Sequence, residues 1–352
     1  MKPGGLRARG FILSSPRPAT VRPIFRSPLQ ILGSGHALPK ACVTSDDLDA
    51  AHAKPRGWLF KRSGVAQRYV CGAEDQLDLA LEAAAKAMAE ADTEPGDIAL
   101  LLFAAAVPYQ SIPATAPLIQ QRLGIRDGAC MSFDINSTCL GFVTALDIAS
   151  RMIPHGRKAL VVASEVASRG LPWSSDPQIA ALFGDGAAAV VVDAATEDAG
   201  VLASRMETYP SAYDACTLGA GGTRYDYHHD RPAFDANSFF RMDGEALYRV
   251  TVKHFEPFLD RLLKDAGWTR DDVDVVIPHQ ASPGALAHLA RRCGFKPEIV
   301  VNIVRDHGNQ IAASIPTALS IARQTQRALT GHKALILGTS AGVSLGGMAL
   351  VL

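Results

Sequence analysis

The sequence predicts an α/β protein built from two halves of similar topology. Three stretches of the first half recur in the same order in the second half, at nearly one offset: residues 97–103 as 272–278, 144–149 as 317–322, and 156–162 as 331–337. In both halves, helical and strand-like patterns alternate, which is typical of layered α/β folds. An internal repeat of this kind indicates one architecture used twice. We therefore place the halves at residues 29–195 and 196–352.

The first half contains five predicted elements. Residues 79–91 carry Ala, Leu and Met at helical spacing, whereas residues 98–106 form a continuous apolar run, as a strand buried on both faces would. Residues 140–153 are apolar on nearly all sides, which indicates a helix enclosed by other elements. Residues 159–163 and 187–192 are predicted to be further buried strands.

The second half repeats this order. We predict a helix over residues 246–266, a strand over 273–278 and a helix over 313–328. Strands over 334–338 and 347–352 follow, with a Gly-rich turn between them.

Composition and charge argue against several classes of partner. Of the 352 residues, 48% are hydrophobic and 20% are charged, which is ordinary for a globular protein. Lys+Arg and Asp+Glu both number 35, so nothing favours nucleic acid or an anionic membrane as a partner. No apolar run approaches the roughly 20 residues that span a bilayer. The six cysteines include no C-x-x-C pair and suit a reducing compartment, so we expect a cytoplasmic protein.

Residues 1–28 differ in kind from the rest of the chain. They hold several Lys, Arg, Pro and Gly residues and neither Asp nor Glu. They lack the apolar core of a secretory signal. We expect a disordered extension, or one that precedes the true start of the protein; an organelle-targeting peptide is the alternative.

Cys139 is the first candidate for chemistry. It lies where a short strand-like run ends and the apolar helix of residues 140–153 begins. Unpaired N–H groups and the positive end of the helix dipole favour a thiolate at such a position. The alternative is a small buried core residue, which is what most free cysteines are. In the second half, Ala312 or Ala313 falls at the equivalent place, so only one half carries a reactive group, and we expect the site at the junction of the halves.

Two residues of the second half are further candidates. His279 follows the predicted strand 273–278, and ligands bind at the ends of strands in open α/β sheets. The alternative is a surface histidine at a turn. Asn309 precedes the predicted helix 313–328. Taken alone it would be an ordinary helix cap or turn residue.

Three segments together resemble the nucleophile, histidine and asparagine segments of the ketoacyl-acyl-carrier-protein synthase III family, within the thiolase superfamily. They are FDINSTCLGF at 133–142, PHQA at 278–281 and HGNQIAASIP at 307–316, in the family's order. WLFKRSG at 58–64 and LFGDGAAAVVV at 182–192 also fit, and the likeness covers residues 29–352. It implies a thiolase-like fold, with the duplicated halves in an αβαβα layered arrangement.

The resemblance implies a role for each candidate. The Cys139 thiolate takes the acyl group of an acyl-CoA. A malonyl thioester, on acyl-carrier protein or CoA, then loses carbon dioxide, and His279 and Asn309 donate hydrogen bonds to the enolate oxygen. The enolate carbon attacks the acyl group to give a 3-oxoacyl thioester, while the backbone N–H groups of Cys139 and Gly342 form the oxyanion hole. Neither a metal nor a cofactor is implied beyond the acyl-CoA substrate.

The resemblance also assigns the surroundings of the site. Trp58 and Arg62 are expected to frame a coenzyme A mouth. Ile112 is expected to reach the acyl pocket of the neighbouring subunit in a homodimer. The apolar stretch 101–107, which leads to Pro108 and Tyr109, is expected to lie near that partner.

Three places depart from the family's pattern. Residues 282–284 are Ser-Pro-Gly, where the family usually has Asn and then Arg two positions on. Pro177 stands where a second Arg is expected, and Gln310 stands where Thr is usual. In the family those arginines face the phosphates of coenzyme A or the incoming carrier protein. The departures put the usual donor in doubt and leave the reaction class unchanged; Arg291 and Arg292 are candidate replacements.

Rival functions within the superfamily differ at specific positions. Head-to-head condensing enzymes of long-chain hydrocarbon synthesis carry a Glu as base where this chain has Ile112, so we favour decarboxylation. Acyl transfer to a hydroxyl or amine stays open because of the missing arginines. A non-enzymatic chain-length partner would lack the cysteine, and Cys139 is present.

Three other motifs have simpler explanations. G-x-S-x-G at 338–342 follows a strand, as in α/β-hydrolases, yet the short remainder of the chain reads as a strand and has no histidine. His228-His229-Asp230 lies in a loop without partners at metal-ligand spacing. Gly184-Asp185-Gly186 lacks the Lys of a phosphate-binding loop, which makes a tight turn the better interpretation.

Overall fold

The structure, a computed structural model, describes residues 27–154, 156–194 and 199–352. The predicted boundary between the halves at residue 195 lies outside the described residues, as does nearly all of the predicted N-terminal extension. Ser27 is an exception, because it is buried and its backbone pairs with that of Val201. Ser27, which was predicted to belong to the extension, is therefore part of the folded body.

The first half forms a five-stranded sheet in the order β1-β7-β6-β4-β5. Its strands are β1 (Gln30–Ala37), β4 (Ile98–Ala104), β5 (Met131–Ile135), β6 (Lys158–Glu165) and β7 (Gly186–Asp193). β4 pairs in parallel with both β5 and β6, whereas β7 is antiparallel to its two neighbours. The apolar run predicted as a doubly buried strand is thus a central strand of this sheet.

The second half forms a four-stranded sheet in the order β11-β12-β13-β8. Its strands are β8 (Gly200–Thr208), β11 (Val275–Pro278), β12 (Lys333–Ser340) and β13 (Ser344–Val351). β11 and β12 are parallel, and the other pairs are antiparallel.

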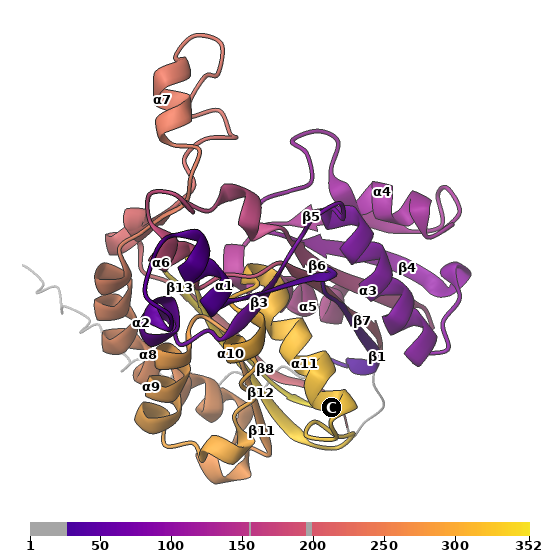
Figure 1. The fold of residues 1–352 in the computed structure, drawn as a ribbon. Coiled ribbons are helices and arrows are strands. Elements are labelled where there is room, and N and C mark those ends of the chain that lie inside the picture. The colour runs from indigo at the N-terminus through magenta and orange to yellow at the C-terminus, as the bar shows by residue number, and fades with distance from the viewer. Residues whose placement is uncertain (1–26, 155, 195–198) are drawn as a thin grey trace, which may run out of the picture.

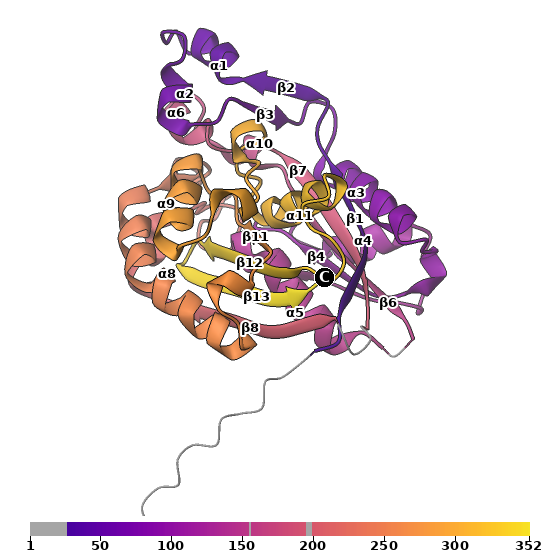
Figure 2. The same ribbon diagram turned by 90° about the horizontal axis from the view of Figure 1, so that it is seen from below.

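Helices separate and cover the two sheets, which gives five layers (Figures 1 and 2). Helices α5 (Gly141–Met152) and α11 (Ser314–Gln324) lie between the sheets and share one apolar core with both. Helix α3 (Gln76–Glu90) covers the outer face of the first sheet, and helices α8 (Gly244–Ala266) and α9 (Pro283–Cys293) cover that of the second. The layering αβαβα expected from the resemblance is therefore present.

Smaller elements surround this body. They are β2 (Ala41–Thr44), α1 (Ser45–Ala51), α2 (Trp58–Ser63), β3 (Gln67–Val70), α4 (Thr115–Arg122), α6 (Pro177–Ala180) and α10 (Val304–His307). A further segment projects from the body as an arm (Figure 1). It comprises β9 (Cys216–Thr217), α7 (Arg231–Ala236) and β10 (Arg241–Met242), and the two strands pair at its base.

The predicted elements are all present, with shifts at their ends. The predicted helix 313–328 shifts most, because α11 ends at Gln324. The repeat extends to the backbone: Thr138 and Ile311, at equivalent places, both have positive φ angles, of 47° and 49°. Each opens a short 3-10 turn that leads into a central helix. This places Ala312, rather than Ala313, opposite Cys139.

Candidate active site

Cys139 lies in a tight turn at the junction of the two halves. The turn, residues 138–140, follows β5 and precedes α5. A side chain added at Gly141 would put its Cβ 3.3 Å from Cβ of Ala104 and 3.6 Å from Cβ of Ala312. The turn that carries Cys139 therefore packs closely against β4 of its own half and against the equivalent turn, residues 311–313, of the second half.

The electrostatics of Cys139 differ from the prediction. A 3-10 turn, rather than the first turn of an α-helix, surrounds the residue. Burial, then the negative charge of Glu165 and the nearby Cys216, raises the pKa of Cys139 to about 12, and N–H groups of Ala341 and Cys139 oppose this only weakly. The expectation that the helix start favours a thiolate was wrong, because desolvation of the charged form outweighs the backbone donors.

His279 is buried beside the same junction. It follows β11 directly, and its N–H donates to the carbonyl of Leu337 on β12 at 2.7 Å. Only 6% of the residue is exposed, so it is not a surface histidine at a turn. Burial lowers the pKa of His279 to about 4, which keeps the imidazole neutral at physiological pH. Its Nδ1 has no hydrogen-bond partner in the part of the chain described.

Asn309 is also buried, in the loop that precedes the turn of residues 311–313. Its Oδ1 accepts from N–H of Ile311 at 2.8 Å, and its Nδ2 lies 3.5 Å from the carbonyl of Ala281, close after His279. The oxygen therefore fixes the local backbone, as a turn asparagine would. The amide nitrogen, held only loosely, is available to donate a hydrogen bond.

Gly338, on β12, brings the histidine and cysteine segments together. A Cβ at this position would lie 2.8 Å from Cδ2 of Leu140 and 3.1 Å from Cβ of His279. Leu140 follows Cys139 directly, so the cysteine and histidine segments both pack against the backbone of Gly338, which has no side chain. Gly342 lies in the following turn with φ of 93°. Its adjacent residue Ala341 donates toward the Cys139 sulfur, while the oxyanion role of Gly342 stays a prediction.

Glu165 belongs to this site and was missed in the sequence. It ends β6, is 1% exposed, and its Oε1 accepts from the N–H groups of Ala106 at 2.6 Å and Ala312 at 3.4 Å. Burial raises the pKa of Glu165 to about 8. An acidic residue that ends a continuous apolar strand was the available signal.

Two further features are a cleft that has His279 in its wall and a stacked pair of side chains on α2. A narrow, mainly apolar cleft between α8 and α9, with a volume of about 80 Å³, has His279 in its wall together with Tyr248 and Leu289. On α2, the guanidinium of Arg62 stacks 3.8 Å from the ring centre of Trp58. The two residues predicted to frame the mouth therefore form one unit.

Both positions that lack the expected arginines flank helix α2. Pro177 begins α6, which contacts α2, and Gly284 lies in the first turn of α9. Nearby, Pro283 Cγ lies 2.9 Å from where a Cβ of Gly64, at the end of α2, would be. Of the suggested replacements, Arg292 forms an ion pair with Glu256 at 3.0 Å. Arg292 is therefore a weaker candidate for a phosphate contact.

The stretch 101–107, which was predicted to lie near a partner subunit, is only partly exposed. Residues 101–105 are buried inside the sheet and cannot face a partner. Beyond them the chain turns outward: Val107 is 48% exposed and Ile112 87% exposed. The expected partner contact is thus restricted to residues 107–112.

The remaining motifs have structural roles. Ser340 ends a strand that is followed by β13, not by the helix of a nucleophile elbow. His228 and His229 are exposed in the arm, and the described residues contain no group that could hold a metal ion. Asp185 is fully buried and accepts from the N–H groups of Cys71 and Ser168, so it is a structural carboxylate rather than part of a phosphate loop.

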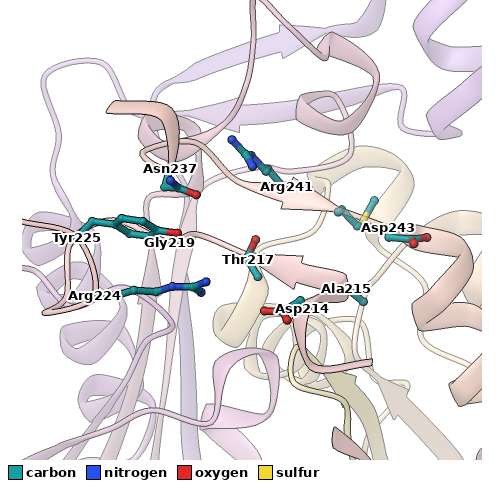
Figure 3. Close-up of a pocket in the computed structure, with 10 residues that line it drawn as sticks. Asp214, Ala215, Thr217, Gly219, Arg224, Tyr225, Asn237, Arg241 and Asp243 are labelled. Atoms are coloured by element: carbon teal, nitrogen blue, oxygen red, sulfur yellow. The ribbon is translucent and has the colours of Figure 1, made fainter. Parts of the chain in front are cut away.

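A separate polar pocket of about 480 Å³ lies at the base of the arm (Figure 3). Arg224 and Tyr225 line it on one side, Asp243 lines it on the other, and Thr217 and Asp214 lie between them. Its mixed charges and its lining set it apart from the site around the cysteine. No helix in the described ranges is long and apolar enough to cross a membrane.

The profiles and the relatives that match this chain describe the same kind of synthase. A profile described as 3-oxoacyl-[acyl-carrier-protein (ACP)] synthase III matches residues 133–210, and one of the C-terminal part of the same synthase matches residues 263–352. The chain is 36% identical to the beta-ketoacyl-[acyl-carrier-protein] synthase III of Erythrobacter litoralis over 323 residues, which is 90% of this chain and 97% of that protein. The identity to the protein of the same name from Rhizorhabdus wittichii is also 36%, over 91% and 98% of the two chains.

Solved structures of synthases with the same description also superpose on this chain. The 3-oxoacyl-[acyl-carrier-protein] synthase III of Aquifex aeolicus superposes with a TM-score of 0.82 at 31% identity, over 92% of this chain and all of that one. The synthase of Pseudomonas aeruginosa gives 0.81 at 30% identity, over 92% and 98%. An OleA variant of Xanthomonas campestris gives 0.80 at 23% identity, over 94% and 100%, and shares the fold alone.

Proposed function

Because the chain belongs to the beta-ketoacyl-acyl-carrier-protein synthase III family, we propose that it condenses an acyl group taken from acyl-CoA with a malonyl thioester, with loss of carbon dioxide. The product is a 3-oxoacyl thioester. The observation that carries the proposal is the convergence of Cys139 with a buried, neutral His279 and a loosely held Asn309 amide at the junction of the halves.

The first step loads the acyl group. The sulfur of Cys139 attacks the thioester carbonyl, the bond to the coenzyme A sulfur breaks, and the thiol proton ends on that leaving sulfur. Because the resting thiol has a pKa of about 12, the proton must leave as the substrate binds. The N–H groups of Cys139 and of the 341–342 turn are suited to stabilise the oxyanion.

The second step generates the carbon nucleophile. As the malonyl carboxylate leaves as carbon dioxide, negative charge develops on the thioester oxygen. Neutral His279 and the Asn309 amide can each donate a hydrogen bond to that oxygen, and a preorganised donor of this kind is worth about 3–4 kcal/mol in the transition state. The enolate carbon then attacks acyl-Cys139, and the thiolate leaves.

The cleft that has His279 in its wall is the candidate entrance for both substrates. A thioester arm is long and narrow, which suits a slender apolar cleft between α8 and α9. The stacked Trp58 and Arg62 lie on the neighbouring helix α2, where a flat ring and a cation suit the nucleotide of coenzyme A.

The absence of disulfides among the six cysteines supports a cytoplasmic setting.

The working unit proposed is a homodimer. β5 is an edge strand of the first sheet, and Met131 on it is 55% exposed. Ile112, at 87% exposure, is the most exposed large apolar side chain among the described residues and lies in the segment that turns outward beyond β4. Exposed apolar side chains on an edge strand and on the loop that follows β4 favour contact with a second copy.

Acyl transfer to a hydroxyl or amine is the second candidate. The observation that favours it is the loss of two cationic side chains, at Pro177 and Gly284, beside the mouth. Acyl transfer to a hydroxyl or amine would share the loading step with the condensation, but it would not require decarboxylation. Release of carbon dioxide from a malonyl thioester therefore separates the two.

The test is intact-protein mass spectrometry after incubation with a panel of acyl-CoAs. We expect one acyl mass to appear on the parent protein and none on Cys139→Ala. A Cys216→Ala variant, which removes the nearby second thiol, is the matched control and should still be labelled. Labelling that persists without Cys139 would remove the nucleophile assignment.

A further inference from the structure

Glu165 is a buried carboxyl group for which the proposed reaction has no assigned use. Its Oε1 already accepts from the N–H groups of Ala106 and Ala312. Among the described residues, no Lys, Arg or His forms an ion pair with it. Burying a carboxylate without a cation is costly, which favours the protonated acid. A protonated acid in turn needs an acceptor for its hydrogen.

Gln310 offers an acceptor that lacks a donor. The residue is fully buried, and its Nε2 donates to the carbonyl of Asp185 at 3.0 Å. That bond fixes which end of the amide is nitrogen. The other end, Oε1, is buried and has no hydrogen-bond donor in the described part of the chain. An unsatisfied buried carbonyl oxygen is destabilising, so a donor is expected close by.

The register of the sheet places the two groups face to face. Glu165 is directly opposite Gly186 in the antiparallel pair of β6 and β7. Opposite residues direct their Cβ atoms to the same face, about 4.5–5.5 Å apart. A Cβ on Gly186 would lie 2.1 Å from Nε2 and 3.4 Å from Oε1 of Gln310. The Gln310 amide thus occupies the side-chain space that faces Glu165, and Gly186 is required for it to fit there.

We propose that Glu165 is protonated in the working enzyme, donates its carboxyl hydrogen to Oε1 of Gln310, and thereby positions the turn that carries Asn309. Gln310 follows Asn309 directly, and the N–H of Ala312, two residues further on, donates to Oε1 of the same carboxyl group. The carboxyl group of Glu165 therefore contacts this turn through two residues, Gln310 and Ala312, and we call this arrangement the clamp. Its catalytic consequence rests on the proposed role of Asn309 in decarboxylation.

The surroundings make this clamp sensitive to alkali. Burial, reinforced by the charge of Asp185, raises the pKa of Glu165 to about 8, and Cys139 is the other titratable group within range. The turn of residues 311–313 has no titratable side chain, and α3 presents the uncharged Gln76 to this end of β6. Above pH 8 a carboxylate would face the carbonyl oxygen of Gln310, and the clamp would open.

The test uses the full chain, with Glu165→Gln as the key variant. Its amide can donate to Gln310 as the protonated acid does, but cannot ionise. We expect carbon dioxide release from malonyl-CoA by the parent to fall at least about fivefold between pH 7 and pH 9.5, whereas release by Glu165→Gln, compared with its own rate at pH 7, should show no such alkaline fall. Gln310→Leu should lose about tenfold at pH 7 while acyl loading of Cys139 stays within about twofold.

Infrared spectroscopy tests the protonation without relying on catalysis. A protonated-carboxyl C=O band that titrates near pH 8 should be present in the parent and missing from Glu165→Gln. Absence of that band in the parent, or an alkaline fall that persists in Glu165→Gln, would overturn the clamp. A parent that shows the band but neither loads acyl groups nor releases carbon dioxide would instead refute the proposed function.

Discussion

Among the individual residues, His279 is one whose protonation depends on burial. With its pKa at about 4, it is neutral throughout the range in which the protein would work and can donate a hydrogen bond to an enolate oxygen without competing as an acid. Its neutral state also has a cost in acid. The unfolded chain binds a proton near pH 6.5, whereas the folded protein does not do so until about pH 4.

Stability should therefore fall as the pH drops from 6.5 towards 4. The His279 contribution to this loss is up to about 3 kcal/mol in the free energy of unfolding. Urea unfolding at pH 7 and pH 4.5 would measure it. His279→Gln, which cannot ionise, should lose distinctly less stability over that interval than the parent; equal losses would contradict the burial effect.

The roles of His279 and Asn309 can be separated from that of Cys139. Loading needs only the sulfur, whereas decarboxylation develops the charge that the two donors stabilise. We expect His279→Ala and Asn309→Ala each to retain acyl loading and to release carbon dioxide from a malonyl thioester at least about a hundredfold more slowly. Release at the parent rate by either variant would show that its donor is not used.

Among the elements, β12 connects the two catalytic segments through a glycine. Gly338→Ala would press on both Leu140 and His279, whereas Gly346→Ala, on β13, would press on Leu140 alone. Overpacking of this kind typically costs about 1–3 kcal/mol of stability, so both variants should melt at lower temperature.

Only Gly338→Ala should also slow decarboxylation relative to acyl loading, because it alone displaces the histidine. Thermal unfolding and the two activity assays check this directly. If both variants slow decarboxylation equally, Leu140 rather than His279 transmits the effect.

Helices α6 and α9, which flank α2, carry the two positions that lack the expected arginines. Proline and glycine side chains at 177 and 284 cannot offer the charge-assisted bonds of an arginine, each worth about 1.5–3 kcal/mol. We expect weak or unusual use of malonyl-carrier protein compared with malonyl-CoA and malonyl-pantetheine, measured as kcat/KM.

Arg291 and Arg292 provide the control for this prediction. Arg292 is already paired with Glu256, so Arg291→Ala should weaken any remaining carrier preference more than Arg292→Ala. A strong carrier preference that survives both substitutions would mean that the missing arginines do not matter.

In the whole molecule, the edge strand β5 of the first sheet and the loop that follows β4 carry exposed apolar side chains. Met131 on β5 and the segment 107–112 present apolar side chains there, and we expect a homodimer at micromolar concentration by light scattering. Met131→Lys should weaken the dimer. Met206→Lys, which alters a similarly exposed methionine on β8 of the other sheet, should not. A monomeric parent would contradict this prediction and the expected role of Ile112.

The sequence by itself predicted the repeat, the main strands and helices of the two cores, and the three candidate residues, because each is encoded in a short stretch of chain. Apolar periodicity marks β4, α5 and α11 locally, and Cys139, His279 and Asn309 lie in motifs of a few residues. The electrostatics required the tertiary structure. The helix start suggested an acidic Cys139 thiol, but atoms from distant segments desolvate the sulfur and raise its pKa.

Glu165 shows the same division. Its place at the end of an apolar strand is visible in the sequence, but its contacts come from residues 106 and 312, far away in the chain. The pairing of Arg292 with Glu256 and the burial of residues 101–105 likewise follow only from packing. Local patterns fix which element forms, whereas burial, charge and hydrogen bonding at the site depend on which distant segments the fold brings into contact.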